Sequence, residues 1–152
     1  MSNKRFVLVQ DRKGMMWDLL LYVPTVIALV SMAFKFWYGE DVSLAYLFSF
    51  LACFFFMMGA NRILKTRLMI LPTAPIAIEI GDAGTQIIMR NGEQQGLKDL
   101  RVYADYSGRS FGLVGLDKLG QRLQFIFHKG QFSTIKNYQE IQELLKANKK
   151  LD

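Results

Sequence analysis

Two long apolar segments dominate the first half of the chain. The first runs from about Met16 to Tyr38 and the second from about Ser43 to Leu64, and each is almost free of charge. A helix rises about 1.5 Å per residue, so the 20 positions from Trp17 to Trp37 span about 30 Å, the thickness of bilayer hydrocarbon. Tryptophan and tyrosine favour the water–lipid boundary, so Trp17, Trp37 and Tyr38 are predicted to be membrane-interface anchors. The chain is therefore predicted to be a membrane protein with two spans.

Charged residues near the spans predict their orientation. Only a short turn, Gly39–Val42, separates the two segments, so we expect them to be antiparallel neighbours. Basic residues precede the first span and follow the second: Lys4, Arg5, Arg12, Lys13, Arg62, Lys65 and Arg67. Because positive residues stay on the inner side, both termini are predicted to be cytoplasmic, in a bacterial inner membrane.

Small residues predict which surfaces of the two spans meet. The hydrophobic effect does not drive helices together in lipid, so spans associate where small side chains allow close packing. On the second span one stripe recurs every four positions: Ala45, Ser49 and Cys53. On the first span another recurs every three: Thr25, Ala28 and Ser31. We expect these stripes to face each other. The opposite surface of the second span would then present bulky side chains to lipid or to another subunit: Phe48, Phe55 and Phe56.

After Pro72 and Pro75 the pattern changes to short strand-like runs separated by turn residues. Six strands are predicted, at 76–80, 85–90, 93–96, 100–106, 110–116 and 121–128. The dipeptide Asn91-Gly92 is typical of a two-residue hairpin turn. A further strand-like run, Phe6–Gln10, is predicted to pair with an edge of this sheet, because the topology places both on the same side of the membrane.

A helical period follows the last strand. Ser133 or Thr134 can cap a helix that runs to about Asn148. Its apolar residues are expected to form one stripe: Ile135, Tyr138, Ile141, Leu144 and Leu145.

The predicted fold class is an α+β membrane protein. It comprises a cytoplasmic N-terminal segment with a strand (1–14), a transmembrane helical hairpin (15–64), a linker (65–75) and a cytoplasmic antiparallel sheet or barrel closed by a C-terminal helix (76–152). The last part resembles the pleckstrin-homology (PH) arrangement, and the whole layout resembles bacterial membrane-anchored PH-like proteins. The resemblance lies in the order of elements along nearly the whole chain, and no residue motif carries it. It implies binding or assembly work without catalysis.

Charge adds a candidate binding surface. The chain carries 19 Lys/Arg against 13 Asp/Glu, a net charge of +6. Basic residues of the predicted strands and turns are candidates for one face that contacts anionic lipid headgroups or a partner: Arg101, Arg109, Lys118, Arg122 and Lys129. The pattern favours a merely solvated face over such a contact surface. Nucleic acid is not expected as a partner, because no basic run is interleaved with stacking aromatics.

Catalytic chemistry has little support in this sequence. His128 is the sole histidine and Cys53 the sole cysteine, so neither a nucleophile–base pair nor a thiolate–imidazole metal site is predicted, and no cofactor is expected. Asp18 is the one acidic residue near a span, at interface depth, where a proton or ion role is the weaker alternative.

The segment Asp105–Ser110 resembles the Asp-x-Ser-x-x-Gly signature of PilZ domains, which bind cyclic dinucleotides together with an upstream arginine pair. Ser110 stands where that signature has glycine, and Arg62 and Arg67 are five positions apart where the family has four.

We expect a non-enzymatic accessory or assembly subunit of a larger inner-membrane complex, which docks through its spans and its PH-like domain. The alternative is a membrane-anchored sensor that binds anionic lipid headgroups or a cyclic dinucleotide.

Overall fold

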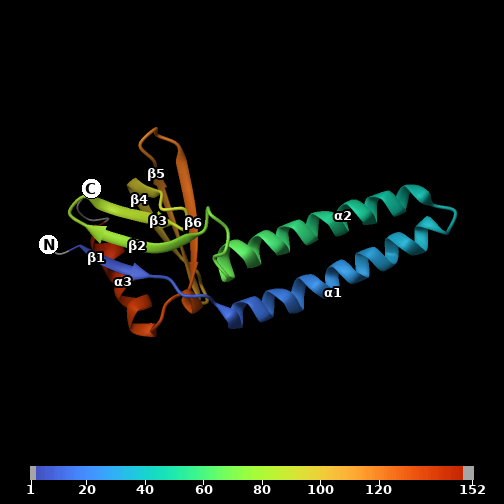
Figure 1. Cartoon of the computed structure of the whole chain (residues 1–152), viewed down its shortest axis with the longest axis horizontal. Helices are drawn as coiled ribbons and strands as arrows, with labels where there is room; N and C mark the ends of the chain where they lie inside the picture. The colour runs from blue at the N-terminus through green and yellow to red at the C-terminus, as the bar shows by residue number, and fades with distance from the viewer. Residues whose placement is uncertain (1–2, 149–152) are drawn as a thin grey trace. The chain divides into compact units, whose positions relative to one another are not determined.

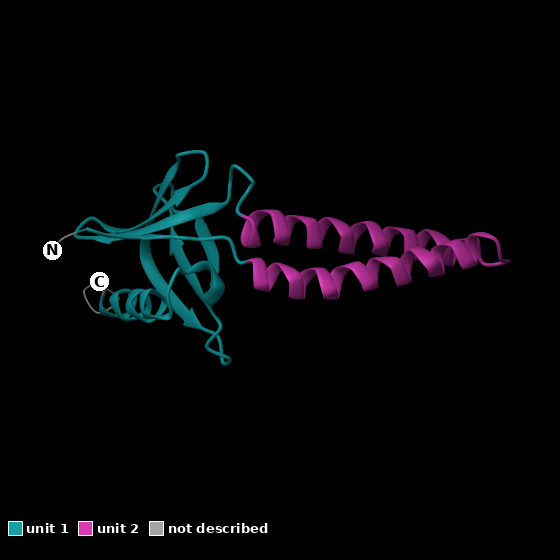
Figure 2. Ribbon diagram, turned by 60° about the horizontal axis from the view of Figure 1, so that its bottom comes forward, with its two compact units in different colours: residues 1–11, 69–152 teal, residues 12–68 magenta. Residues whose placement is uncertain are grey.

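The computed structural model describes residues 3–148, which form two compact units (Figure 2). One unit is helical, Arg12–Leu68, and the other is a sheet unit built from the segments before and after it. The strand β1 (Lys4–Val7) precedes the helices, yet it pairs with β2 (Pro75–Gly81), which follows them. The helical unit is therefore an insertion in the chain of the sheet unit. The predicted ranges 1–14 and 76–152 also include residues 1–2 and 149–152, which lie outside the described residues.

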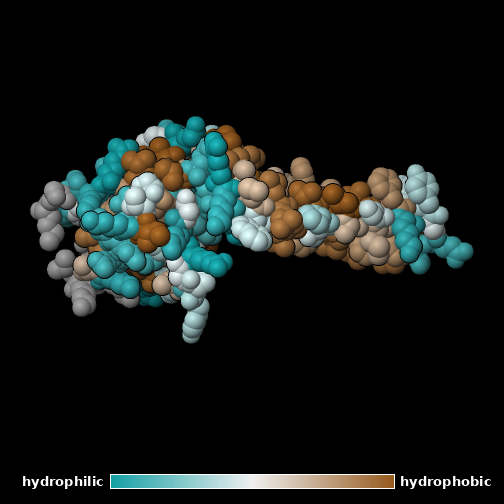
Figure 3. All heavy atoms as spheres, turned by 90° about the horizontal axis from the view of Figure 1, so that it is seen from below, coloured by the Kyte–Doolittle hydropathy of each residue, from teal (hydrophilic) through white to brown (hydrophobic). Residues whose placement is uncertain are grey.

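The helical unit is a hairpin of two long helices, α1 (Arg12–Trp37) and α2 (Val42–Asn61), and α2 continues into the π-helical turn η1 (Arg62–Arg67) (Figure 1). Both helices are long and apolar enough to cross a membrane. Hydrophobic side chains cover the visible face of the hairpin, and hydrophilic ones gather at its turn (Figure 3). Helical backbone starts earlier than the predicted hairpin range and continues past Leu64 to Arg67, so the predicted linker loses its first residues.

The helix interface keeps only Ala45 of the predicted stripe on the second span. Small residues of α2 that are buried recur every seven positions: Ala45, Ala52 and Gly59. A seven-residue repeat keeps one helix face turned toward its neighbour, whereas a step of four drifts by about 40° each time. Cys53 is therefore exposed.

The predicted stripe of α1 is also displaced. Ala28 and Ser31 are exposed and Thr25 is half-buried, as is Ser49 of α2. The hydroxyl of Ser31 donates to the carbonyl of Ile27 at 2.8 Å, so it is satisfied within its own helix. Ser31 therefore does not need a hydrogen-bond partner on α2.

Aromatic rings fill part of the helix interface. Phe48 stacks on Phe36, with ring centroids 5.5 Å apart and planes only 3° from parallel. Phe48 and Phe55 are half-buried, and only Phe56 of the three phenylalanines is exposed. Two of the three predicted lipid-facing rings are therefore partly enclosed. At Gly59 an added Cβ would lie 2.8 Å from Cγ of Tyr22, so this glycine allows the tyrosine ring to lie against the α2 backbone.

The sheet unit is an open six-stranded antiparallel sheet with the order β1-β2-β3-β4-β5-β6. The remaining strands are β3 (Gly84–Met89), β4 (Gln94–Ala104), β5 (Ser110–Leu116) and β6 (Arg122–His128). The strand near the N-terminus takes an edge position, with Phe6 opposite Ile78. An α+β fold with two long apolar helices, an antiparallel sheet and a C-terminal helix is thus confirmed.

The structure differs from the predicted strands at three places. The N-terminal strand predicted at 6–10 is found at Lys4–Val7, and Leu8 forms only an isolated bridge. The predicted strands 93–96 and 100–106 form the single strand β4, which is irregular between Lys98 and Arg101, where Asp99 has a φ of 50°. The connection after β3 is not the two-residue type I′ turn that Asn91-Gly92 predicts, which needs positive φ at both central residues. Only Gly92 has positive φ, 87°, and β4 begins two residues later.

One face of the sheet encloses the core together with η2 (Lys129–Gln131) and α3 (Ile135–Asn148). Its largest fully buried side chains are Phe111, Phe127, Ile78, Ile87, Leu113, Ile141 and Leu145. Thr134 caps α3, because its hydroxyl accepts the N–H of Asn137 at 3.2 Å. The hydroxyl of Tyr138 donates to the carbonyl of Gly108 at 3.2 Å, and burial raises the pKa of this phenol.

Ile135 does not join the apolar stripe of α3, contrary to the sequence prediction. It is 59% exposed, whereas Ile141 is fully buried. With 3.6 residues per turn, position 135 lies about 90° around the helix from the centre of the buried face.

The two isoleucines of α3 allow a matched test of this packing. Ile141→Ala is expected to lower the free energy of unfolding by about 2–5 kcal/mol, because it leaves a cavity in the core. Ile135→Ala is expected to change it by less than about 0.5 kcal/mol. Thermal unfolding of the full chain in detergent micelles measures both, and equal effects would contradict this placement of α3.

Candidate functional site

A charged cluster joins the two helices at the open end of the hairpin. Nε of Arg67 donates to Oδ2 of Asp18 at 2.7 Å, and Nε of Arg62 donates to the same oxygen at 3.2 Å. The side chains of Asp18 and Arg67 are 8% and 9% exposed, whereas that of Arg62 is 46% exposed. Asp18 therefore has a charged partner in the other helical segment. This pairing favours a structural role for Asp18, which links the two helices, over a role in ion transfer.

The π-helical turn explains how two arginines reach one carboxylate. The N–H of Leu68 donates to the carbonyl of Ile63 at 2.9 Å, the five-residue step of a π-helix. In an α-helix Arg62 and Arg67 would point about 140° apart. The wider turn reduces this angle, so both side chains point toward α1. Sequence reasoning missed this cluster, although an acid at the start of one span and arginines at the end of its antiparallel neighbour are a usable signal.

The PilZ-like features do not assemble into one site. Arg62 and Arg67 bind Asp18 in the helical unit, whereas Asp105–Ser110 belongs to the sheet unit and connects β4 to β5. There the N–H of Gly108 donates to the carbonyl of Asp105 at 3.0 Å. The hydroxyl of Ser107 donates to the carboxylate of Asp105, and this hydrogen bond lowers the pKa of Asp105. A local turn accounts for this segment.

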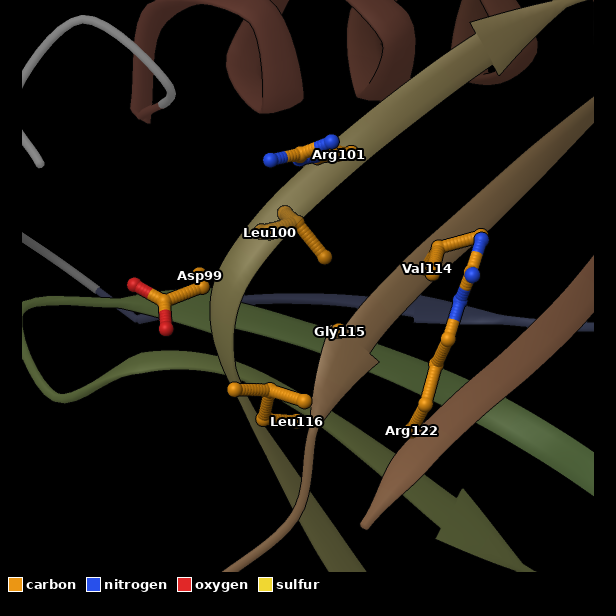
Figure 4. A pocket seen from close by; sticks show the side chains of 7 residues that line it. All are labelled: Asp99, Leu100, Arg101, Val114, Gly115, Leu116 and Arg122. Atoms are coloured by element: carbon orange, nitrogen blue, oxygen red, sulfur yellow. The ribbon is translucent and has the colours of Figure 1, made fainter. Parts of the chain in front are cut away.

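The sheet unit has a groove on the face opposite its core, which we call the outer groove (Figure 4). Its volume is about 510 Å³, and its lining residues are Asp99, Leu100, Arg101, Val114, Gly115, Leu116 and Arg122. The strand register explains their meeting: Arg101 lies opposite Val114, and Arg122 lies opposite Leu116. Strand side chains alternate between faces, so these four share the outer face.

Two arginines flank this groove. Arg101 comes from β4 and Arg122 from β6, on either side of the floor that β5 provides (Figure 4). Both are exposed, and among the described residues neither makes an ion pair. Lys98, opposite Leu116, adds a third positive charge on the same face, and Asp99 adds one negative charge. The outer groove can therefore accept an anionic group.

The five predicted basic residues separate into two groups. Arg101 and Arg122 line the outer groove, and Lys118 lies in the turn that precedes Arg122. Arg109 and Lys129 lie at the other end of the β5–β6 hairpin, where the N–H of Lys129 donates to the carbonyl of Arg109 at 2.8 Å. The seven residues of β5 separate these ends by about 20 Å. The five residues therefore do not form one continuous basic face.

An apolar row lies beside the outer groove. Tyr103 is opposite Gly112 and Gly112 is opposite Ile126, so the three cross β4, β5 and β6 on the outer face. Tyr103 is 51% and Ile126 is 54% exposed. Arginine and tyrosine are enriched in protein interfaces.

Comparison with known proteins adds no assignment: no family model, no curated protein and no solved structure matches this chain.

Within residues 3–148, no group of three or more His, Cys, Asp or Glu residues is placed to hold a metal ion. The predicted anchors Trp17, Trp37 and Tyr38 are all exposed on the helical unit.

Removing the charge of Asp18 tests whether its ion pair with Arg67 stabilises the helical hairpin. Asp18→Asn is expected to destabilise the hairpin by about 3 kcal/mol, because it leaves the buried guanidinium of Arg67 without its counter-charge. Asp41→Asn is the matched control, since Asp41 is exposed next to the turn of the hairpin. Thermal loss of helical circular dichroism in micelles measures both variants. Equal melting temperatures for the two variants would show that the ion pair does not stabilise the hairpin.

Proposed function

We propose that this protein is a non-enzymatic accessory or assembly subunit of a larger bacterial inner-membrane complex. Its hairpin would insert with both termini cytoplasmic, and its PH-like sheet unit would dock on a cytoplasmic surface of the partner. The observation that carries this proposal is the uncovered outer face of β4, β5 and β6. That face combines the exposed row of Tyr103 and Ile126 with Arg101 and Arg122, which form no ion pair with the residues that the structure describes.

The composition of this face supports docking of a protein. Aromatic residues and arginine contribute most of the binding energy at interfaces, and they act best when a partner removes them from water. Tyr103 and Ile126 are large side chains that gain from such burial, at about 25 cal/mol per Å² of apolar surface. The opposite face of the same strands is already buried in the core. The outer face is therefore the surface of these strands that is free to bind.

The chain connectivity also supports an anchoring role. The peptide bonds Asp11–Arg12 and Leu68–Met69 join the hairpin to the sheet unit at both ends. The hairpin is therefore connected through the chain to two strands that pair with each other, β1 before it and β2 after it. A bilayer-inserted hairpin would keep the domain at the inner surface permanently, as an assembly subunit requires.

Crosslinking in native membranes tests the proposal. The full chain is expected to be captured in a complex much larger than itself after mild detergent extraction. Tyr103→Ala is expected to reduce capture at least tenfold, because it removes an exposed aromatic contact. Tyr106→Ala is the matched control, since Tyr106 is fully exposed in the turn after β4. A native chain that always emerges alone would refute the proposal.

A second candidate function, a sensor of anionic lipid headgroups, is favoured by the two unpaired arginines of the outer groove. Paired guanidiniums suit phosphate oxygens because each offers several donors in a planar fork. Each basic residue near an anionic headgroup contributes about 1 kcal/mol.

Titration with a short-chain phosphatidylglycerol tests this second function on the full chain in zwitterionic micelles. Saturable binding is expected to weaken roughly 25-fold when Arg101 and Arg122 are both changed to Gln, the equivalent of about 2 kcal/mol. Lys136→Gln, on the exposed side of α3, is expected to leave binding unchanged. Binding that never saturates would remove this candidate.

A further inference from the structure

The strand β6 forms one edge of the sheet and is paired on one side only. Two hydrogen bonds reveal which of its backbone groups face β5. The N–H of Lys129 donates to the carbonyl of Arg109, and the N–H of Asp117 donates to the carbonyl of Gln121. In an antiparallel pair such residues alternate with residues whose groups point the other way. Positions 122, 124 and 126 therefore direct their N–H and C=O groups away from the sheet.

These outward groups have no partner among the described residues. The register of β5 and β6 runs without a bulge from Ser110 opposite His128 to Leu116 opposite Arg122. Within residues 3–148, β6 pairs with no other strand. The free edge ends at His128, whose N–H donates to Oε1 of Gln131 at 2.8 Å. Beyond it the chain is covered, because Phe132 forms a bridge with Leu8.

The free edge also lacks the usual protection. Proteins block exposed edges with proline, bulges, inward charges or a covering segment, because an open edge is a template for another strand. Positions 122–128 contain no proline, and their one permanent charge is that of Arg122. Gln124 and Ile126 are exposed. Such an edge is suited to β-augmentation, in which main-chain hydrogen bonds hold an extended peptide.

Charge indicates what can occupy this edge. The segment from Arg109 to Lys129 carries four basic residues and one acidic residue, Asp117. A second copy of the chain would place equal positive charges against each other along the new pair, which is unfavourable. An acidic extended segment would instead place carboxylates near Arg122 and Lys129. Charge complementarity therefore favours an acidic partner over self-association.

We propose that the free edge of β6 binds an extended acidic segment of the partner as a seventh strand of the sheet. This inference rests on the proposed function, since it names the docking mode of the assembly subunit. Ile126 packs against the side chain of the added strand that lies opposite it on the outer face, and Arg122 favours an acidic residue near its own end of β6. The segment's main chain supplies hydrogen bonds to positions 122, 124 and 126.

Substitutions at Gln124 test this docking mode in native membranes. Proline at position 124 removes an outward N–H and keeps the bonds of positions 123 and 125 to β5, as expected for an edge strand. Capture of the large complex is expected to fall at least tenfold for Gln124→Pro. For Gln124→Ala it is expected to stay unchanged, because the main chain and not the amide side chain carries the contact. Amide exchange at Leu113 and Phe125 checks that Gln124→Pro keeps the core folded.

A peptide probe tests the charge preference on the full chain in micelles. The heptapeptide Glu-Val-Glu-Val-Glu-Val-Glu is expected to slow amide exchange at Gln124 and Ile126 at least tenfold. The same peptide with Lys in place of Glu is expected to have no effect. No protection by the acidic peptide, or equal protection by both, overturns the proposal.

The two proposals fail in different ways. Equal capture by Gln124→Pro and the native chain overturns docking at the β6 edge while the assembly function stands. Absence of any complex with the native chain overturns the assembly function itself.

Discussion

The pairing of β1 with β2 is the interaction on which the rest of the sheet unit depends. It joins strands that lie on opposite sides of a long inserted hairpin, and closing a loop of that length has an entropic cost. The antiparallel packing of α1 and α2 lowers this cost, because it brings the two ends of the insertion together. Near those ends, Nε of Arg67 donates to Oδ2 of Asp18 at 2.7 Å and so joins the two helical segments. Hairpin and sheet therefore stabilise each other through the chain.

Once β1 is in place, it also completes the core. Phe6 and Leu8 are buried there, and Lys4 forms an ion pair with Glu140 of α3. The N-terminal strand thus contacts both the sheet and the helix that covers its inner face. The strand β1 forms the other edge of the sheet, but it has only four residues and carries the charges of Lys4 and Arg5, which disfavour pairing with a further strand. The longer edge, that of β6, is therefore the better template for a partner.

The arginines of this chain serve two different purposes. Arg62 and Arg67 form ion pairs with Asp18, whereas Arg101 and Arg122 flank an open groove and make no ion pair with any described residue. Sequence alone does not separate these roles, because the residue type is the same. A buried guanidinium needs a local partner for stability, and an exposed one remains free for a ligand. Burial and partner together assign the role.

The sequence by itself determined the kinds of elements. Apolar length predicts the two helices, short strand-like runs on either side of turn residues predict β5 and β6, and the helical period after Gly130 predicts α3, since all three are local properties of the chain. The tertiary structure alone decided the helix interface at Ala52 and Gly59, the fusion of two predicted strands at Asp99, and the sharing of Asp18 by two arginines. These features depend on how distant backbones approach each other. No local pattern encodes the angle at which two helices meet or the edge at which a sheet stays open.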